Sequence, residues 1–251
     1  MSKALASVMS ALIEGFFVGP LQMRCSVVTC LETGDTIIID GGDEASRLID
    51  WIEEAKGDGP DESNMPELEI EKSVVVLLNT HAHFDHSGAI PPLLDRYEVE
   101  WYLHEGDHFL QSTAKQSAAR WRLQVPEPAT PTKTFEHGDE LTFGNLRFEV
   151  RHAPGHSLGS VCLILRTPEG EPDHAFVGDV LFAGGVGRTD IPNSGGDWPL
   201  LKKSIEEQLF TLDDDTVVYP GHGPLTTIGE ERRNNPFVGE GAVGPTRNFY
   251  L

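Results

Sequence analysis

The sequence has 251 residues, of which 39% are hydrophobic and 24% are charged, and this composition is typical of a soluble globular protein with a substantial core. Its 40 acidic residues outnumber the 19 basic ones, and the formal net charge of −21 disfavours binding to nucleic acids or to anionic membrane surfaces. The cysteines Cys25, Cys30 and Cys162 form no C-x-x-C pair, so we expect reduced thiols in a cytoplasmic protein.

The N-terminal part of the chain is predicted to be rich in strands. The weakly apolar segment 4–18 is interrupted by Glu14 and lacks a basic start, so we interpret it as a leader into the first strand, without an export signal. Residues 57–72 are acidic and rich in proline and glycine, which indicates a solvated loop insertion. Apolar runs bounded by turn residues predict strands at 16–20, 23–31 and 36–40, and a helix after Asp43.

A cluster of potential metal ligands, His-Ala-His-Phe-Asp-His at residues 81–86, follows the next apolar run. Side chains two residues apart share a face of an extended backbone, so His81 and His83 can bind one metal ion together. The chain must then turn before a helical pattern begins. This turn directs Asp85 and His86 differently from the first pair, which suits a second metal ion beside the first.

The rest of the chain alternates between short strands and helices, and the tail 239–251 has no clear pattern. Hydrophobic periodicity predicts strands at 74–78, 99–103, 141–143, 146–151, 161–166, 175–177 and 217–219, and helices at 112–123, 198–209 and 227–235.

Three further ligand candidates, His156, Asp179 and His222, each follow a short strand or lie in a glycine-rich turn. A ligand at the end of a strand is held by a rigid scaffold, while the metal stays accessible from the loop side. Together with the first cluster they give five histidines and two aspartates, enough for a two-metal site with an acidic bridge. Imidazole suits zinc, iron or copper, and carboxylates widen the choice to manganese.

The other histidines lack paired ligands. His152 lies within a predicted strand, so we expect a core position or a contact to a ligand. Asp107 lies in a polar segment without a paired ligand, and we expect its replacement to leave activity nearly intact. Surface or structural roles are expected for His104, His108, His137 and His174.

Four motifs contain these candidate ligands: His-x-His-x-Asp-His at 81–86, Pro-Gly-His-Ser at 154–157, Gly-Asp at 178–179 and Pro-Gly-His-Gly at 220–223. In order and rough spacing they resemble the motifs of the metallo-β-lactamase superfamily, and within it those of the short bacterial glyoxalase II-like hydrolases. Two more segments, at 182–190 and 223–237, resemble signatures of that subgroup. The resemblance covers about residues 16–238.

The resemblance implies a single domain over residues 1–251, folded as a four-layer αββα sandwich with the site along one edge of the two sheets. It also implies two divalent metal ions, zinc in the first place and iron or manganese as alternatives. By this resemblance, His81, His83 and His156 bind the first ion, Asp85, His86 and His222 bind the second, and Asp179 bridges them.

The sequence departs from typical glyoxalase II enzymes, which have a long helical C-terminal region that helps to bind glutathione. Here only 29 residues follow His222. The segment after Asp179 also lacks the basic and aromatic cluster that the longer enzymes use for the glutathione carboxylates. Arg188, Arg232 and Arg233 are the basic residues best placed to replace it, with surface salt bridges as the alternative interpretation.

These features predict a metal-dependent hydrolase of small-molecule thioesters, of the S-D-lactoylglutathione type. Two metals flanking a water lower its pKa toward neutrality and supply a hydroxide for attack, and a thiolate leaves readily. Asp85 and Asp179 are expected to orient the hydroxide and accept its proton. The alternative is a persulfide dioxygenase of the same fold, with one iron bound by His81, His83/His156 and Asp179.

Other functions fit the sequence less well. A β-lactamase is disfavoured because cysteine is absent from the ligand positions, and a nucleic-acid-processing enzyme is disfavoured by the net charge of −21. A non-enzymatic metal-binding module would require a coordination shell closed to water.

Overall fold

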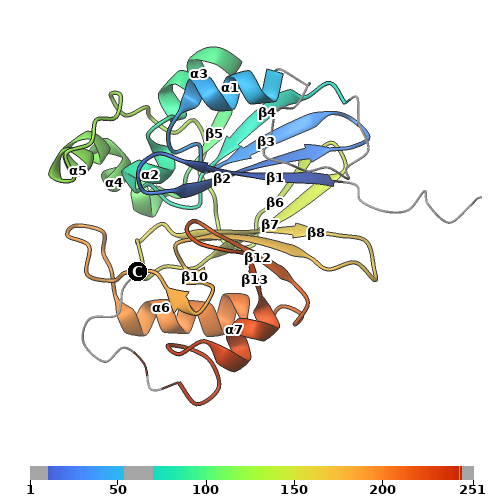
Figure 1. The fold of residues 1–251 in the computed structure, drawn as a ribbon, viewed down its shortest axis with the longest axis vertical. Helices are drawn as coiled ribbons and strands as arrows, with labels where there is room; N and C mark the ends of the chain where they lie inside the picture. Colours follow the sequence, from blue (N-terminus) through green and yellow to red (C-terminus); the bar gives the residue numbers. More distant parts are fainter. Residues whose placement is uncertain (1–10, 54–69, 243, 245–251) are drawn as a thin grey trace, which may run out of the picture.

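The computed structural model describes residues 11–53, 70–242 and 244. Most of the predicted insertion (57–69) and of the tail lies outside the described residues. Two β-sheets lie face to face between two layers of helices, which confirms the predicted αββα sandwich (Figure 1). No helix in the described part of the chain is both long and apolar enough to cross a bilayer.

The first sheet follows the order of the sequence. Its first three strands are antiparallel, and the last two are added in parallel, as expected where a helix connects successive strands. Helices α1 (Ala45–Glu53) and α3 (Ile90–Tyr97) cover its outer face (Figure 1). The strands are β1 (Ala11–Val18), β2 (Met23–Cys30), β3 (Asp35–Ile39), β4 (Ser73–Leu78) and β5 (Glu100–Tyr102).

The second sheet has the strand order β13-β12-β9-β8-β7-β6. Its outer face is covered by α6 (Trp198–Ser204), the π-helical turn η2 (Ile205–Leu209) and α7 (Ile228–Asn234). The strands are β6 (Glu140–Phe143), β7 (Leu146–His152), β8 (Val161–Arg166), β9 (His174–Gly178), β12 (Val217–Pro220) and β13 (Thr226–Thr227).

Successive residues of the central strands alternate between two apolar layers. Ile37 and Ile39 of β3 face the core between the sheets, whereas Ile38 faces the helices α1 and α3. The same alternation occurs along β8, with Leu163 packed between the sheets and Ile164 packed beneath α6. Because both faces are buried, these strands are continuous apolar runs in the sequence.

The structure differs from the sequence-based prediction at three places. Strand β1 begins at Ala11 instead of residue 16, and Glu14 is tolerated within it because Lys72 pairs with its carboxylate at 2.9 Å. The predicted helix 112–123 is instead α4 (His108–Ser112) followed by α5 (Ala114–Arg120). The strands β10 (Leu181–Phe182), β11 (Gly185–Val186) and β13 were not predicted, since two residues show no periodicity.

The break between α4 and α5 lies at Thr113, whose hydroxyl donates to the carbonyls of Phe109 and Leu110 at 3.0 and 3.2 Å. A side chain that bonds back to the preceding turn competes with the regular helical pattern.

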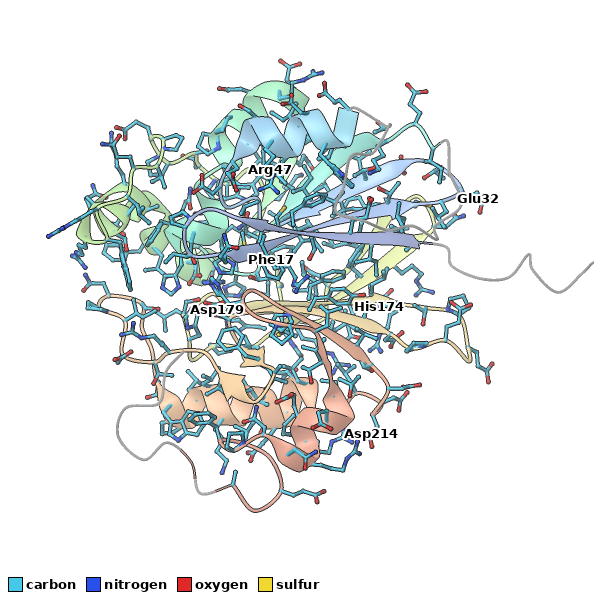
Figure 2. The ribbon with its side chains drawn as sticks, in the orientation of Figure 1. Phe17, Glu32, Arg47, His174, Asp179 and Asp214 are labelled. Atoms are coloured by element: carbon cyan, nitrogen blue, oxygen red, sulfur yellow. The ribbon has the colours of Figure 1, made fainter. Side chains whose placement is uncertain are left out.

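Three strands end at the same edge of the sandwich. Strand β4 leads into the loop before α2 (Phe84–Ser87), β9 ends at Gly178, and β12 ends at Pro220. Figure 2 shows Asp179 between the two sheets, on the side where α2 and α5 lie in Figure 1. The segments that were predicted to carry metal ligands therefore meet at one place.

Candidate metal centre

All seven predicted ligands lie together at this edge. Within each of three groups, one ligand atom per residue lies within 4.8 Å of the others. The groups are His81, His83 and His156; His81, His86 and Asp179; and Asp85, His86 and His222.

The first group consists of three ring nitrogens. Nε2 of His81 and Nε2 of His156 lie 3.0 and 2.9 Å from Nδ1 of His83. Burial lowers the pKa of His83 to about 3, and burial also holds the pKa values of His81 and His156 below the ordinary histidine value. All three rings are therefore neutral near pH 7, which is the form that binds a metal.

The outer nitrogens of this group are already occupied. Nδ1 of His156 donates to the carbonyl of Arg188 at 2.7 Å. Nδ1 of His81 lies 3.2 Å from the Thr80 hydroxyl, which accepts from it because its own hydrogen goes to a carboxylate. Both Nε2 atoms therefore carry lone pairs directed at His83, and the single hydrogen of that ring cannot serve both. A cation among the three nitrogens satisfies all of them.

The second group combines Asp85, His86 and His222. Nε2 of His222 lies 3.2 Å and Nε2 of His86 lies 3.8 Å from Oδ2 of Asp85. Nδ1 of His222 donates to the Leu21 carbonyl at 3.1 Å, and Nδ1 of His86 donates to Asp40 at 3.0 Å. Partners on the outer nitrogens again leave both Nε2 atoms free to act as ligands.

Asp179 lies between the two groups. Its Oδ1 is 3.3 Å from Nε2 of His86, and its Oδ2 is 3.6 Å from Nε2 of His156 and 3.7 Å from Nε2 of His222. Gly221 allows this approach, since a Cβ there would lie 2.3 Å from Oδ1 of Asp179. One carboxylate thus contacts ligands of both groups, as a bridging ligand would.

The electrostatics of the cluster fit a bound cation. Nε2 of His86 and Oδ1 of Asp179 are buried without a hydrogen bond of good geometry. Although burial acts to lower the pKa of His86, the carboxylates of Asp179, Asp40 and Asp85 hold it well above its ordinary value. The carboxylates therefore favour a positive charge at this point, and a metal ion can supply it in place of a proton.

The sequence analysis missed Asp40, which was assigned only to a strand. This buried residue has a left-handed φ of 56° and accepts from the Thr80 amide at 2.8 Å and the Thr80 hydroxyl at 2.7 Å, besides His86. Asn79 donates to the same carboxylate at 3.2 Å and to the His86 carbonyl at 2.8 Å. The available signal was an acidic residue at the end of an apolar strand, directly before two glycines.

Asp107, which lies in a polar segment of the sequence and was expected to matter little for activity, is buried in the structure. The residue ends the 3₁₀ turn η1 (Glu105–Asp107) and is fully buried. Its carboxylate accepts from the amides of Ala82 and Gly159 at 2.9 and 2.6 Å and from the Ser157 hydroxyl at 2.8 Å. Asp107 therefore joins the loop of His81 and His83 to the loop of His156.

The remaining histidines lie outside these groups. His152 ends β7, stacks on His104 with 4.1 Å between ring centroids, and donates through Nε2 to the Leu158 carbonyl at 2.8 Å. It thus supports the loop that carries His156. His174 forms a hydrogen bond with the Tyr219 hydroxyl at 3.1 Å, a structural role.

A cavity of about 750 Å³ opens above the ligands. Arg188 lines it and pairs with Asp190 at 2.8 Å. Arg232 and Arg233 do not line it: both pair with Asp214, which Figure 2 labels beside α7 and away from Asp179. The lining residues are Leu21, His83, Phe84, Asp85, Ser117, Trp121, His156, Asp179, Phe182, Ala183, Arg188, Ile191, His222, Gly223 and Pro224.

Arg232 also donates to the carbonyls of Phe210 and Leu212, both at 2.7 Å. These contacts tie α7 to the end of the preceding helical segment. They correspond to the structural interpretation that the sequence left open for this arginine.

Comparison with known proteins gives the family. The sequence profile of the Metallo-beta-lactamase superfamily matches residues 18–222. Hydroxyacylglutathione hydrolase GloC of Haemophilus influenzae is 39% identical over 228 residues, which cover 90% of this chain and 97% of that protein.

Two solved structures resemble the whole fold. The structure of the BLEG-1 B3 metallo-beta-lactamase has a TM-score of 0.76 and 32% identity, covering 90% of this chain and 99% of that one. The structure of TTHA1623 in a di-iron-bound form has a TM-score of 0.71 and 37% identity, covering 89% and 98%. With its fold, ligand order and family match in agreement, the chain is a metallo-hydrolase that belongs to the metallo-β-lactamase superfamily.

Proposed function

We propose that the protein is a dinuclear metal-dependent hydrolase of thioesters, with S-acyl-glutathione-type substrates. The observation that carries this proposal is the pair of ligand groups joined by Asp179 at the base of an open cavity. The 39% identity with a protein named hydroxyacylglutathione hydrolase supports the substrate class.

In this proposal each residue has a defined role. When bound, two divalent metals lower the pKa of a water and stabilise negative charge on the attacked carbonyl. Asp85 and Asp179 line the cavity, so their carboxylates can orient the attacking water and accept its proton. The ligands are His81, His83 and His156 for one ion, Asp85, His86 and His222 for the other, and Asp179 for both.

Purified protein is expected to contain close to two metal ions per chain, with zinc as the first choice and iron or manganese as alternatives. Removal of the ions with a chelator should abolish hydrolysis and lower the melting temperature. Without the ions, the lone pairs and carboxylate charges of the seven converging side chains would repel one another, which destabilises the fold. Elemental analysis and melting curves before and after chelation measure both effects. One iron per chain together with oxygen uptake on a persulfide would instead establish the dioxygenase alternative.

The substrate class is tested with S-D-lactoylglutathione. A chromogenic cephalosporin is the comparison substrate, since the BLEG-1 structure shares 32% identity. We expect kcat/KM for the thioester to exceed that for the β-lactam. The opposite order would replace the thioesterase proposal with a β-lactamase.

Arg188→Ala is expected to raise KM for a glutathione thioester more than it lowers kcat. Arg188 lines the cavity, and its guanidinium can hold a carboxylate of the carrier in both the ground state and the transition state. Loss of one charge-assisted hydrogen bond corresponds to about 1–3 kcal/mol. Steady-state kinetics give the split between KM and kcat.

Arg232→Ala is the matched control for this prediction. Because Arg232 contacts the carbonyls of Phe210 and Leu212, its removal should lower the melting temperature and leave KM unchanged. An unchanged KM in Arg188→Ala would point to a carrier other than glutathione.

A further inference from the structure

The two sides of the cavity differ in character, and each is tied to one ligand group. On one side, the Leu21 carbonyl accepts from His222 at 3.1 Å. On the other side, the Arg188 carbonyl accepts from His156 at 2.7 Å. Leu21 and Arg188 both line the cavity, each beside a histidine of a different ligand group.

The side next to His222 is apolar. The Phe182 ring lies 6.3 Å from the His222 ring, and Phe84 directly precedes the ligand Asp85. Phe84 packs against α5 in one apolar cluster with Leu21. The residues that form this surface, called here the apolar wall, are Leu21, Phe84, Trp121, Phe182 and Pro224.

Trp121 is an exposed member of this wall. It follows α5 directly, lines the cavity, and leaves 54% of its surface exposed. A large ring held at the rim of a cavity offers apolar area that a ligand can cover at little cost in side-chain entropy.

The opposite side offers limited charge. Among the described residues that line the cavity, Arg188 is the one cationic side chain, and it already pairs with Asp190 at 2.8 Å. A carrier with two carboxylates therefore finds one partly neutralised cation. This side can hold one carboxylate, so contacts to the carrier contribute little to substrate selectivity.

We propose that the apolar wall binds the acyl group, so that the preferred substrates are thioesters with an extended aliphatic or aromatic acyl chain. This inference rests on the proposed thioester hydrolysis. The carbonyl carbon of a thioester placed beside Asp179 has two substituents that point in different directions. One is the sulfur with its carrier, and the other is the acyl chain. A carrier carboxylate suits the side of Arg188, which directs the acyl chain to the wall beside His222.

The test separates binding from chemistry. S-methyl-, S-butyl- and S-octylglutathione are thioethers without a hydrolysable carbonyl, and their Kd values for the metal-loaded protein are measured by titration calorimetry. We expect Kd to fall about threefold to fourfold for each added methylene until the wall is covered, the increment of burying one such group. S-acylglutathiones of matching lengths are assayed for hydrolysis, and kcat/KM should rise in parallel.

Trp121→Ala should weaken S-octylglutathione about tenfold and leave S-methylglutathione unchanged, and Trp121→Phe should restore part of the difference. Phe109→Ala is the matched control, because Phe109 is 61% exposed on the neighbouring α4 and does not line the cavity. Equal Kd values for all three thioethers, or equal weakening of the short and long ones by Trp121→Ala, would overturn the inference. Chain-length-dependent binding without cleavage of any thioester would refute the hydrolase function while retaining the acyl-binding wall.

Discussion

Asp179→Ala is expected to abolish hydrolysis and to release metal. Asp179 is the residue whose oxygens approach ligands of both groups, at 3.3 Å from His86 and 3.6 Å from His156. Without it, the two ions would lose their shared carboxylate, and His86 would lose the largest negative partner that raises its pKa. We expect a loss in kcat/KM above the 10–100-fold that is typical of residues that only contact a ligand.

Elemental analysis and steady-state kinetics on the same preparation measure this effect. Asp179→Asn keeps the side-chain volume and removes the charge, so it separates the role of the carboxylate from packing. Asp95→Ala is the control, since Asp95 is exposed on α3, and it should retain both ions and full activity. An Asp179→Ala protein with two ions and most of its activity would show that the bridge is assigned to the wrong residue.

The second large effect is expected for Asp107→Ala, although this residue is not a proposed metal ligand. The change would leave the amides of Ala82 and Gly159 and the Ser157 hydroxyl without their acceptor in a buried place. Each unsatisfied donor costs about 1–3 kcal/mol. The two ligand loops would also lose their connection, so we expect metal affinity to fall about 10–100-fold, as for other groups that orient ligands.

Melting curves and metal titrations with a competing chelator distinguish these contributions. Glu105→Ala is the matched control, because Glu105 lies in the same 3₁₀ turn and is exposed. Asp107→Asn retains one oxygen acceptor but presents hydrogens toward the other donors, so an intermediate loss is expected. If Asp107→Ala lowered the melting temperature but bound metal as tightly as the parent, the residue would be purely structural.

The convergence of the seven candidate ligands could be predicted from the sequence for a local reason. Each follows a strand whose apolar run is long enough to be recognised, and parallel strands such as β9 and β12 end at the same edge. The expectation that the side chains of His81 and His83 point the same way rests only on the two-residue period of an extended backbone. The four-layer sandwich was implied by the family resemblance, and the strands β3 and β8, buried on both faces, are consistent with it.

The residues that hold these ligands in place could not be predicted, because their contacts are distant in the sequence. Asp40 lies 46 residues from His86, Asp107 lies 50 residues from Ser157, and Leu21 lies 201 residues from His222. Such pairings depend on how the two sheets pack, which hydrophobic periodicity does not encode. Asp107 was also misjudged because a charged residue in a polar segment is usually exposed.

The support of His222 and His156 by carbonyl oxygens has an evolutionary consequence. Leu21 and Arg188 fix these two imidazoles through the main chain, which every amino acid provides, and both residues line the cavity. In the proposed hydrolase, substitutions at both positions could therefore alter which substrates are accepted while the hydrogen bonds that orient His222 and His156 are kept. Substitutions in the cavity walls of such a scaffold can change its substrates, because side chains affect selectivity while the main-chain carbonyls of the same residues orient the histidines.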